Sequence, residues 1–230
     1  EAFYKKVMDG IASGANQRKI AFAKRINRIC SIFGIDIRRK LYKSLLDKFG
    51  GNLTSIVVGG AALRQDVAET FTEFGVNMFQ GYGLTECAPL VASNYPRGNR
   101  LGSVGKPISC MTARIEDGEI LVKGDCVMLG YYKNPEATAE VFTEDGWFRT
   151  GDLGYLDEDG YLYITGRSKN LIILANGKNI YPEELETRLG DYPIVGECLV
   201  LEGRSKGKIC VKAKIYPDAA ALKEELGRKP

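Results

Sequence analysis

Residues 55–86 read SIVVGGAALRQDVAETFTEFGVNMFQGYGLTE, and their pattern is the strongest indication of fold class in the chain. It begins with a short apolar, β-branched run, Ser55–Val58, which predicts a strand, and Val76–Phe79 predicts a second one. Gly75 is placed to end a helix between them. That helix is indicated by apolar residues at helical spacing: Val67, Phe71 and Phe74. Because two strands joined by one helix pair in parallel, the sequence predicts an α/β unit.

A glycine-rich segment follows each of these strands, Gly59–Ala62 after the first and Gln80–Glu86 after the second. The carboxyl ends of neighbouring parallel strands form the edge where α/β sheets bind ligands. Glycines on both sides of Tyr82 would let the backbone approach a flat ligand while the ring stacks on it. Thr85 offers a hydroxyl to phosphate, and Glu86 offers an oxygen to Mg²⁺. An ordinary glycine-rich turn is the alternative interpretation.

The remaining sequence predicts two further regions and a preceding helix. Residues 17–49 have near-helical spacing, and Gly50-Gly51 ends that run. From about residue 98 short strands alternate with turn signals such as Asp117-Gly118, which predicts a small antiparallel β subdomain. Beyond Arg167 strands flank a helix that Pro182 opens. We expect the end of a parallel-sheet α/β subdomain at 1–97, the antiparallel β subdomain at 98–166, and part of an α+β C-terminal lid domain at 167–230.

Two later motifs carry polar side chains suited to a nucleotide. Asp152 stands between glycines in Phe148–Gly154, and in a tight turn its carboxylate would accept hydrogen bonds from the vicinal hydroxyls of a ribose. An aspartate that caps its own turn is the alternative. Arg167 and Lys169 lie in Gly166–Asn170 at the predicted domain boundary, where a crevice and a hinge are expected. Alone, that motif would indicate a surface loop.

The composition excludes several classes of protein. Of 230 residues, 44% are hydrophobic and 27% charged, as in ordinary globular proteins. The chain has no histidine, so it cannot supply a Ser–His or Cys–His nucleophile system or a histidine-ligated metal. Its six cysteines form no Cys-x-x-Cys pair, a pattern that favours reduced thiols over a disulfide framework or a zinc site.

Basic residues are concentrated near the beginning of the chain. Residues 1–50 hold 12 Lys and Arg against 4 Asp and Glu, whereas the net charge of the whole is +3. The basic stretch Lys19–Lys48 could lie on an anionic membrane, although a solvated helix face is the simpler interpretation. The sequence does not indicate nucleic-acid binding. With no long apolar run and no signal-peptide pattern at 1–12, we expect a cytoplasmic protein with a possible peripheral membrane contact.

Taken together and in order, the motifs resemble those of the adenylate-forming, or AMP-binding, superfamily. The version here looks most like a long-chain fatty acid–CoA ligase, an acyl-CoA synthetase. The resemblance covers roughly residues 40–216. It rests on Gly-Gly-Ala at 59–61, Gly-Tyr-Gly-Leu-Thr-Glu at 81–86, Gly-Glu-Ile to Gly-Tyr at 118–131, Phe-Arg-Thr-Gly-Asp at 148–152, Gly-Arg-Ser-Lys at 166–169 and Gly-Lys-Asn-Ile-Tyr-Pro-Glu-Glu-Leu-Glu at 177–186.

The resemblance implies a two-step reaction that uses ATP, Mg²⁺ and coenzyme A. A fatty acid carboxylate attacks the α-phosphorus of ATP to give an acyl-adenylate and pyrophosphate, and the CoA thiol then displaces AMP. The residues it implies for nucleotide and CoA binding are Gly59, Gly60, Ala61, Gln80, Gly81, Tyr82, Gly83, Thr85, Asp152, Arg167 and Lys178. Thr85 and Glu86 would serve catalysis, with Glu86 as the magnesium ligand, and Lys169 would be the hinge of the lid.

Two parts of the family pattern do not occur in this sequence: the Ser/Thr/Gly-rich phosphate loop and the catalytic lysine near the far C-terminus. The first residue is also Glu1 rather than Met. We therefore expect a C-terminal fragment that shows negligible acid-dependent exchange of pyrophosphate into ATP. The alternatives are an acyl–acyl-carrier-protein synthetase, an aryl-CoA ligase, or a non-catalytic module that binds nucleotide or a membrane surface.

Overall fold

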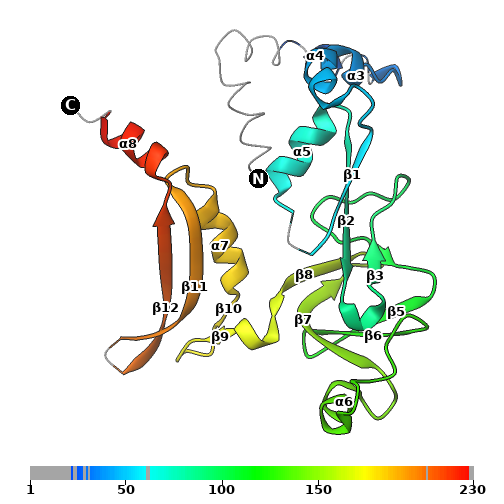
Figure 1. Ribbon diagram of the computed structural model, residues 1–230, viewed down its shortest axis with the longest axis vertical. Helices are drawn as coiled ribbons and strands as arrows, with labels where there is room; N and C mark the ends of the chain where they lie inside the picture. The colour runs from blue at the N-terminus through cyan, green and yellow to red at the C-terminus, as the bar shows by residue number, and fades with distance from the viewer. Residues whose placement is uncertain are drawn as a thin grey trace. The chain divides into compact units, whose positions relative to one another are not determined.

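The chain forms two compact units, shown in a computed structural model that describes residues 22, 25–27, 30, 32–60, 63–205 and 207–227. The first unit is Glu1–Tyr82 with Ser93–Gly105, and the second is Gly83–Ala92 with Lys106–Pro230. Helices and strands occur in both (Figure 1), which confirms the mixed α/β class predicted from the sequence. The subdomain boundaries after residues 97 and 166 stay a prediction.

The first unit contains the predicted strand–helix–strand pattern. Strand β1 (Ser55–Val58) pairs in parallel with β2 (Asn77–Gly83), and helix α5 (Gln65–Glu73) joins them. Gly75 follows the helix with φ +81°, a left-handed conformation that suits glycine and confirms it as the helix-ending residue. The next strands, β3 (Leu90–Ser93) and β4 (Lys106–Pro107), belong for the most part to the second unit.

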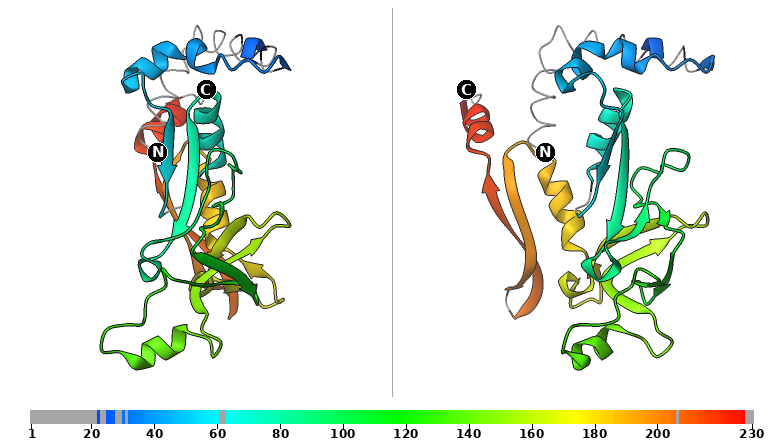
Figure 2. Two further views of the ribbon diagram at one scale, coloured as in Figure 1. Left: turned by 90° about the vertical axis from the view of Figure 1, so that its right-hand side faces the viewer. Right: turned by 45° about the vertical axis from the view of Figure 1, so that its right-hand side comes forward.

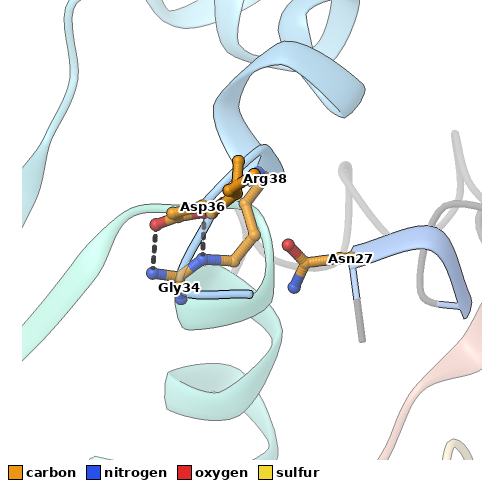
Figure 3. Close-up of a pocket in the computed structure, with 5 residues that line it drawn as sticks. Asn27, Gly34, Asp36 and Arg38 are labelled. Atoms are coloured by element: carbon orange, nitrogen blue, oxygen red, sulfur yellow. Dashed lines mark hydrogen bonds and ion pairs between the residues drawn. The ribbon is translucent and has the colours of Figure 1, made fainter. Parts of the chain in front are cut away.

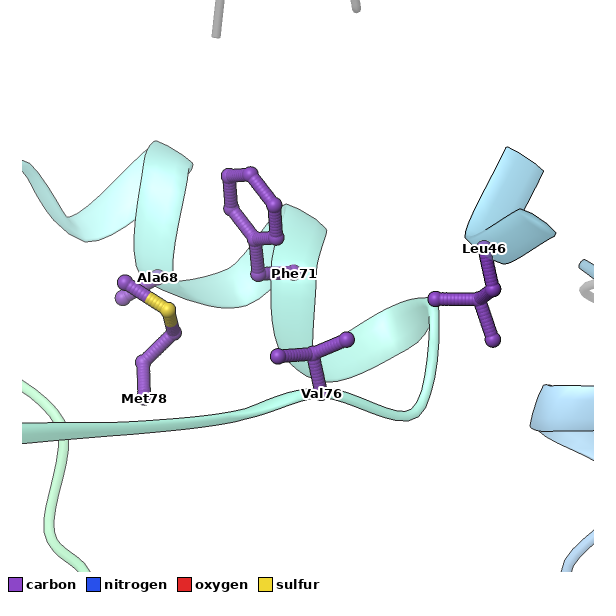
Figure 4. Packing of buried hydrophobic residues seen from close by; sticks show 5 residues of the cluster. All are labelled: Leu46, Ala68, Phe71, Val76 and Met78. Carbon is purple, nitrogen blue, oxygen red and sulfur yellow. The ribbon is translucent and has the colours of Figure 1, made fainter. Parts of the chain in front are cut away.

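The core of the first unit lies between α5 and β2. The apolar residues at helical spacing bury one side of α5, and Figure 4 shows Ala68 and Phe71 of that helix above Val76 and Met78. Leu46 closes the end of the cluster. Tyr42 and Phe74 pack beside it, with ring centroids 4.9 Å apart. Helical spacing in the sequence therefore selects the face that stabilises the parallel pair.

The helix predicted over 17–49 is wrong for part of that range. Residues 22, 25–27, 30 and 32 are helical, as predicted. After a break, α3 (Arg38–Leu41), α4 (Lys43–Leu46) and the 3₁₀ turn η1 (Asp47–Phe49) follow. Gly34 takes φ +70°, and residues 35–37 have no helical assignment. Left-handed backbone cannot continue a right-handed helix, so the run is interrupted at Gly34. Within Lys19–Lys48, residues 19–21, 23–24, 28–29 and 31 lie outside the described residues.

The second unit contains an antiparallel sheet of order β5-β6-β7-β8. Its strands are β5 (Met111–Glu116), β6 (Glu119–Gly124), β7 (Phe148–Leu156) and β8 (Leu162–Arg167). Asp117 and Gly118 both have positive φ in the β5–β6 turn, as the sequence predicted. Ile120, Leu121 and Leu162 are fully buried, so these strands carry the core of the sheet.

Arg114 on β5 organises the surface beside this sheet. Its guanidinium pairs with Asp145 at 2.8 Å and with Glu116 at 2.9 Å. It also stacks over the ring of Trp147, 4.6 Å from the centroid. Hydrogen bonds from Thr143 and then from Arg114 lower the pKa of Asp145 to about 2. The result is a cluster in which one cation holds an indole ring and two carboxylates.

Helix α6 (Pro135–Val141) begins with a side-chain cap and a proline. The side chain of Asn134 accepts a hydrogen bond from the backbone N–H of Ala137 at 3.1 Å, and Pro135 takes the first helical position. The cap satisfies one of the N–H groups that an α-helix leaves without an intrahelical partner.

Removing this cap is expected to destabilise the second unit by about 1 kcal/mol. The variant is Asn134→Ala, measured by urea denaturation followed through the fluorescence of Trp147. Asn134→Asp is the matched control, because its carboxylate accepts the same hydrogen bond and should leave the midpoint nearly unchanged. Equal midpoints for Asn134→Ala and the wild type would show that the cap contributes nothing.

The C-terminal part of the second unit is a helix on a long hairpin. After the 3₁₀ turn η3 (Ser168–Asn170) come the short strands β9 (Ile172–Ile173) and β10 (Asn179–Ile180). Figure 2 shows α7 (Pro182–Gly190) running along the hairpin of β11 (Val195–Ser205) and β12 (Lys208–Pro217). Glu186 of α7 accepts a hydrogen bond from the backbone N–H of Val200 at 2.7 Å. Helix α8 (Ala219–Gly227) follows.

The described helices are all too short or too polar to cross a membrane.

Candidate functional site

In the first unit, two predicted glycine-rich segments lie side by side. Val58 pairs with Gln80 at the end of the β1–β2 ladder, and a Cβ atom added to Gly59 would lie 3.6 Å from the carbonyl oxygen of Gly81. Gly60 takes φ +79°, and a Cβ atom there would meet open space. Ala61 lies outside the described residues. The topology thus places Gly59, Gly60 and Gly81 at one edge of the sheet, while their nucleotide roles stay a prediction.

The prediction that Gln80–Glu86 forms a loop is wrong for its first half. Strand β2 continues through Gly83, because Gln80 pairs with Val58 and also accepts a hydrogen bond from the backbone N–H of Asn94 at 2.9 Å. Gly83 lies so close to Pro89 that an added Cβ atom would collide with the proline carbonyl. Tyr82 is buried. Stacking of its ring on a base therefore stays a prediction.

The side chains of two asparagines that sequence reasoning missed bond backbone groups in and near β2. The side chain of Asn94 donates to the carbonyl of Ser103 at 2.7 Å and accepts from the N–H of Arg100 at 2.9 Å. Asn99 donates to the carbonyl of Met78 at 2.9 Å. The cavity beside Gln80 measures about 10 Å³, room for about one water molecule. Tight packing therefore holds the strand that carries Gln80, Gly81 and Tyr82.

In the second unit, Glu86 is held by two contacts from one segment. Thr85 and Glu86 begin the 3₁₀ turn η2 (Thr85–Cys87), where Thr85 is exposed and Glu86 is half-buried. The hydroxyl of Tyr131 donates to Glu86 Oε1 at 3.1 Å, and the N–H of Met128 donates to the Glu86 carbonyl at 2.7 Å. Burial and then the neighbouring Glu86 carboxylate raise the pKa of Tyr131, so its phenol stays a donor at neutral pH. The carboxylate is thus fixed in orientation.

Sequence analysis gave Tyr131 no role. Its contact with Glu86 joins positions 45 apart along the chain, which no local pattern reveals. The neighbouring Tyr132 is 88% exposed, against 38% for Tyr131, so one tyrosine of the pair faces solvent and the other faces the carboxylate. The one sequence feature that pointed to Tyr131 was its place at the end of the motif at 118–131.

Asp152 and Arg167 lie together on neighbouring strands. They are partners in the β7–β8 ladder, and Arg167 Nε donates to Asp152 Oδ1 at 2.8 Å. The Asp152 side chain is 6% exposed and that of Arg167 is 61% exposed, so the cation covers a buried carboxylate. The predicted tight turn around Asp152 is wrong, because the ladder with β8 holds it inside β7. A left-handed Gly151, with φ +71°, bends the strand instead.

Glu119 and Ser168 fix the backbone next to Asp152. Glu119 Oε1 accepts from the N–H of Gly151 at 3.0 Å, and Oε2 accepts from Arg149 at 2.7 Å. The hydroxyl of Ser168 donates to the carbonyl of Gly151 at 3.0 Å. Both polar groups of the left-handed glycine are therefore bonded, and this positions the Asp152–Arg167 pair.

The other predicted residues of the second unit are exposed. Lys169 lies in η3, one residue beyond Ser168. Lys178 follows a turn in which Asn176 Oδ1 accepts from the Lys178 N–H at 3.1 Å. Tyr82 belongs to the first unit, whereas Asp152 and Arg167 belong to the second. The convergence of these three side chains on one adenosine stays a prediction.

A larger pocket, of about 340 Å³, lies beside α3 and contains none of the predicted site residues (Figure 3). Arg38 in its lining already donates to Asp36 through Nε at 2.9 Å and through a terminal nitrogen at 2.7 Å. The other terminal nitrogen donates to the carbonyl of Thr72 at 2.8 Å. The arginine therefore ties α3 to the end of α5.

The described residues contain no group of three or more His, Cys, Asp or Glu that could hold a metal ion. Mg²⁺ commonly takes one or two protein carboxylates and completes its octahedron with phosphate oxygens and water. The single oriented carboxylate of Glu86 fits that mode, in which a nucleotide would bring the remaining ligands.

Comparisons with known proteins found similar sequences. A family model described as AMP-binding enzyme matches residues 6–132. The chain is 42% identical over 182 residues to the long-chain-fatty-acid–CoA ligase FadD15 of Mycobacterium bovis, covering 79% of this chain and 30% of that protein. It is 38% identical over 181 residues to the 2-succinylbenzoate–CoA ligase of Listeria innocua, covering 76% of this chain and 38% of that protein.

A solved structure is similar as well. The O-succinylbenzoate coenzyme A synthetase of Bacillus subtilis, in complex with ATP and magnesium ion, aligns with a TM-score of 0.66 and 34% identity. The alignment covers 79% of this chain and 42% of that one. The chain thus spans between 30% and 42% of the length of these proteins.

Proposed function

The chain belongs to the family of AMP-binding enzymes, and from that premise we propose that it supplies part of the nucleotide site of an ATP-dependent acyl-CoA ligase. The observation that carries this proposal is the Glu86 carboxylate oriented by Tyr131. In the proposed reaction a carboxylic acid attacks the α-phosphorus of ATP, pyrophosphate leaves, and the thiol of coenzyme A then displaces AMP from the acyl-adenylate.

Glu86 would hold Mg²⁺ in this site. When bound, the ion neutralises charge on the phosphates. Because Tyr131 and Met128 hold both the carboxylate and the backbone of Glu86, its oxygen is oriented before the nucleotide arrives. Such preorganisation avoids reorganisation during the reaction. The exposed hydroxyl of Thr85 would bond a phosphate oxygen beside it.

Asp152 would accept hydrogen bonds from the ribose hydroxyls, with Arg167 assisting. The guanidinium covers the carboxylate, so a ribose that reaches Asp152 shares it with Arg167 or displaces the arginine. The exposed remainder of Arg167 offers further N–H donors to the same ligand. Lys169 would serve as the hinge of the lid, and Lys178 would face coenzyme A. We also keep as a proposal a cytoplasmic location with peripheral membrane contact.

We further propose that the acid is a long-chain fatty acid. Support comes from the 42% identity to FadD15, against 38% to the 2-succinylbenzoate–CoA ligase. An aryl-CoA ligase is the second candidate, and the succinylbenzoate enzymes among the relatives favour it. An acyl–acyl-carrier-protein synthetase would differ only in the thiol that receives the acyl group.

The acid class is tested with the complete gene product. Acid-dependent exchange of labelled pyrophosphate into ATP is measured with palmitate, octanoate, 2-succinylbenzoate and ferulate. Each methylene buried in the acid pocket contributes about 0.8 kcal/mol to binding, and palmitate has more methylenes than octanoate. We therefore expect kcat/KM for palmitate to exceed that for octanoate by at least about tenfold. Preference for an aromatic acid would replace the fatty-acid assignment with the aryl one. Transfer to acyl carrier protein in place of coenzyme A would change the acceptor.

A further inference from the structure

The open end of the β5–β6 hairpin brings two cysteines together. Cys110 directly precedes β5 and Cys126 follows β6 by two residues, and their sulfur atoms lie 3.2 Å apart. Both thiols are free and half-buried. A disulfide between two cysteines requires backbones that are already close and side chains that face each other. Sulfurs in direct contact meet both requirements.

The backbone of the hairpin fixes this approach. Met111 and Gly124 form the last pair of the β5–β6 ladder, and the N–H of Asp125 donates to the carbonyl of Cys110 at 3.2 Å. Gly124 takes φ +156°, and an added Cβ atom would collide with the Cys110 carbonyl oxygen. Glycine at this position therefore permits the close approach that places the two thiols in contact.

We propose that Cys110 and Cys126 form a modification site: a dithiol that a low-molecular-weight disulfide, such as glutathione disulfide, oxidises reversibly to an internal disulfide. The site is distinct from the proposed nucleotide residues.

The reaction balances as two thiol–disulfide exchanges. One protein thiol loses its proton to water and attacks a sulfur of glutathione disulfide, so a protein–glutathione bond forms and one glutathione thiolate leaves. The second protein thiol then loses its proton and attacks the protein sulfur of that mixed disulfide, which expels the second glutathione thiolate. The protein gives up two electrons and two protons, and glutathione disulfide becomes two thiols.

The bond would brace the segment that anchors Glu86. Two residues beyond Cys126, the N–H of Met128 donates to the Glu86 carbonyl at 2.7 Å. The covalent state of the sulfurs can be measured without nucleotide. Failure of this proposal is therefore distinguishable from failure of the proposed function.

Other cysteines of the chain serve as internal controls. Cys87 is fully buried, and burial followed by the Glu86 charge raises the pKa of its thiol to about 11. Cys198 is half-buried like the pair, but its sulfur donates to the backbone carbonyl of Glu186 at 3.4 Å. Accessibility alone would modify Cys198 as readily as Cys110 or Cys126.

The test is peptide mapping of the native chain after exposure to glutathione disulfide under non-reducing conditions. We expect a single linked peptide pair containing Cys110 and Cys126, a mass loss of about 2 Da, and full reversal by dithiothreitol. The variant Cys198→Ser should form the same link. Cys110→Ser should accumulate glutathione on Cys126 instead, because the resolving thiol is gone.

Two results would overturn the proposal. One is a native protein in which Cys198 becomes glutathionylated while no Cys110–Cys126 peptide forms. The other is a mixture of linked pairs like that obtained in denaturant, where contact in the folded state plays no part. Because the wild-type chain alone decides between these outcomes, the test does not depend on any variant folding.

Discussion

Replacing Asp152 with asparagine is expected to weaken the binding of AMP and ATP by about ten- to a hundredfold. A hydrogen bond to a charged group contributes about 1.5–3 kcal/mol, and asparagine offers the ribose no charged acceptor. The amide would also turn an N–H donor toward Arg167, which releases the guanidinium from its 2.8 Å contact. Affinity is measured by calorimetric titration of the complete gene product.

Stability should change much less than affinity in this variant. The partner of Asp152 is 61% exposed, so Arg167 returns to water when the pair is broken and no stranded buried charge remains. Asp145→Asn is the matched control, because it breaks another 2.8 Å aspartate–arginine pair of the same unit. If the control loses affinity equally, Asp152 has no special part in binding the nucleotide.

Replacing Glu86 with glutamine is expected to reduce the apparent affinity for Mg²⁺ by about a hundredfold in the presence of ATP. The effect is large because the variant removes the charged oxygen that would bind the ion. Tyr131→Phe should have a smaller effect of about fivefold, since it removes one hydrogen bond worth about 1 kcal/mol and leaves the ligand in place. Both effects are measured by following ATP binding as the Mg²⁺ concentration is raised.

The chain supplies a control for Tyr131 one residue away. Tyr132→Phe changes the same atoms on a side chain that is 88% exposed, so it should leave the magnesium dependence unaltered. The pKa of Tyr131 gives an independent readout. Because the Glu86 charge is one cause of the raised value, Glu86→Gln should lower that pKa toward 10, as seen by NMR of labelled tyrosine. A magnesium dependence that Tyr132→Phe alters as much as Tyr131→Phe would contradict an orienting role.

The local part of the fold could be predicted because local signals decide it. Apolar spacing and Gly75 define α5, Asn134 and Pro135 begin α6, and Pro182 opens α7. Each signal acts within one or two turns of backbone, so no knowledge of the tertiary structure is needed. The parallel pairing of β1 and β2 then follows from connectivity.

Two errors share one cause, which is glycine. The glycines around Tyr82 and Asp152 predict turns, yet both segments are strands. At Gly83 a neighbouring backbone approaches too closely for a side chain, and at Gly151 a left-handed residue bends the strand. Sequence shows that glycine is present, but only tertiary contacts decide which of its uses applies.

The contacts that position the candidate site could not be predicted. Tyr131 meets Glu86 across 45 positions, and Asn94 bonds backbone groups of Arg100 and Ser103. A backbone carbonyl belongs to every residue type, so a side chain that bonds one has no recognisable partner in the sequence. The residue types at the site could be proposed from the sequence, whereas their orientation required the structure.

The stacking of Arg114 on Trp147 makes the chain a selective optical reporter. Trp147 is the single tryptophan, and the cation that covers its ring belongs to β5 of the second unit. Trp147 emission excited at the red edge of the absorption band therefore changes when the β5–β8 sheet unfolds. It does not report on unfolding of the parallel strands β1 and β2. Any transition seen by circular dichroism but silent in that emission can be assigned, without a label, to a part of the chain outside the β5–β8 sheet.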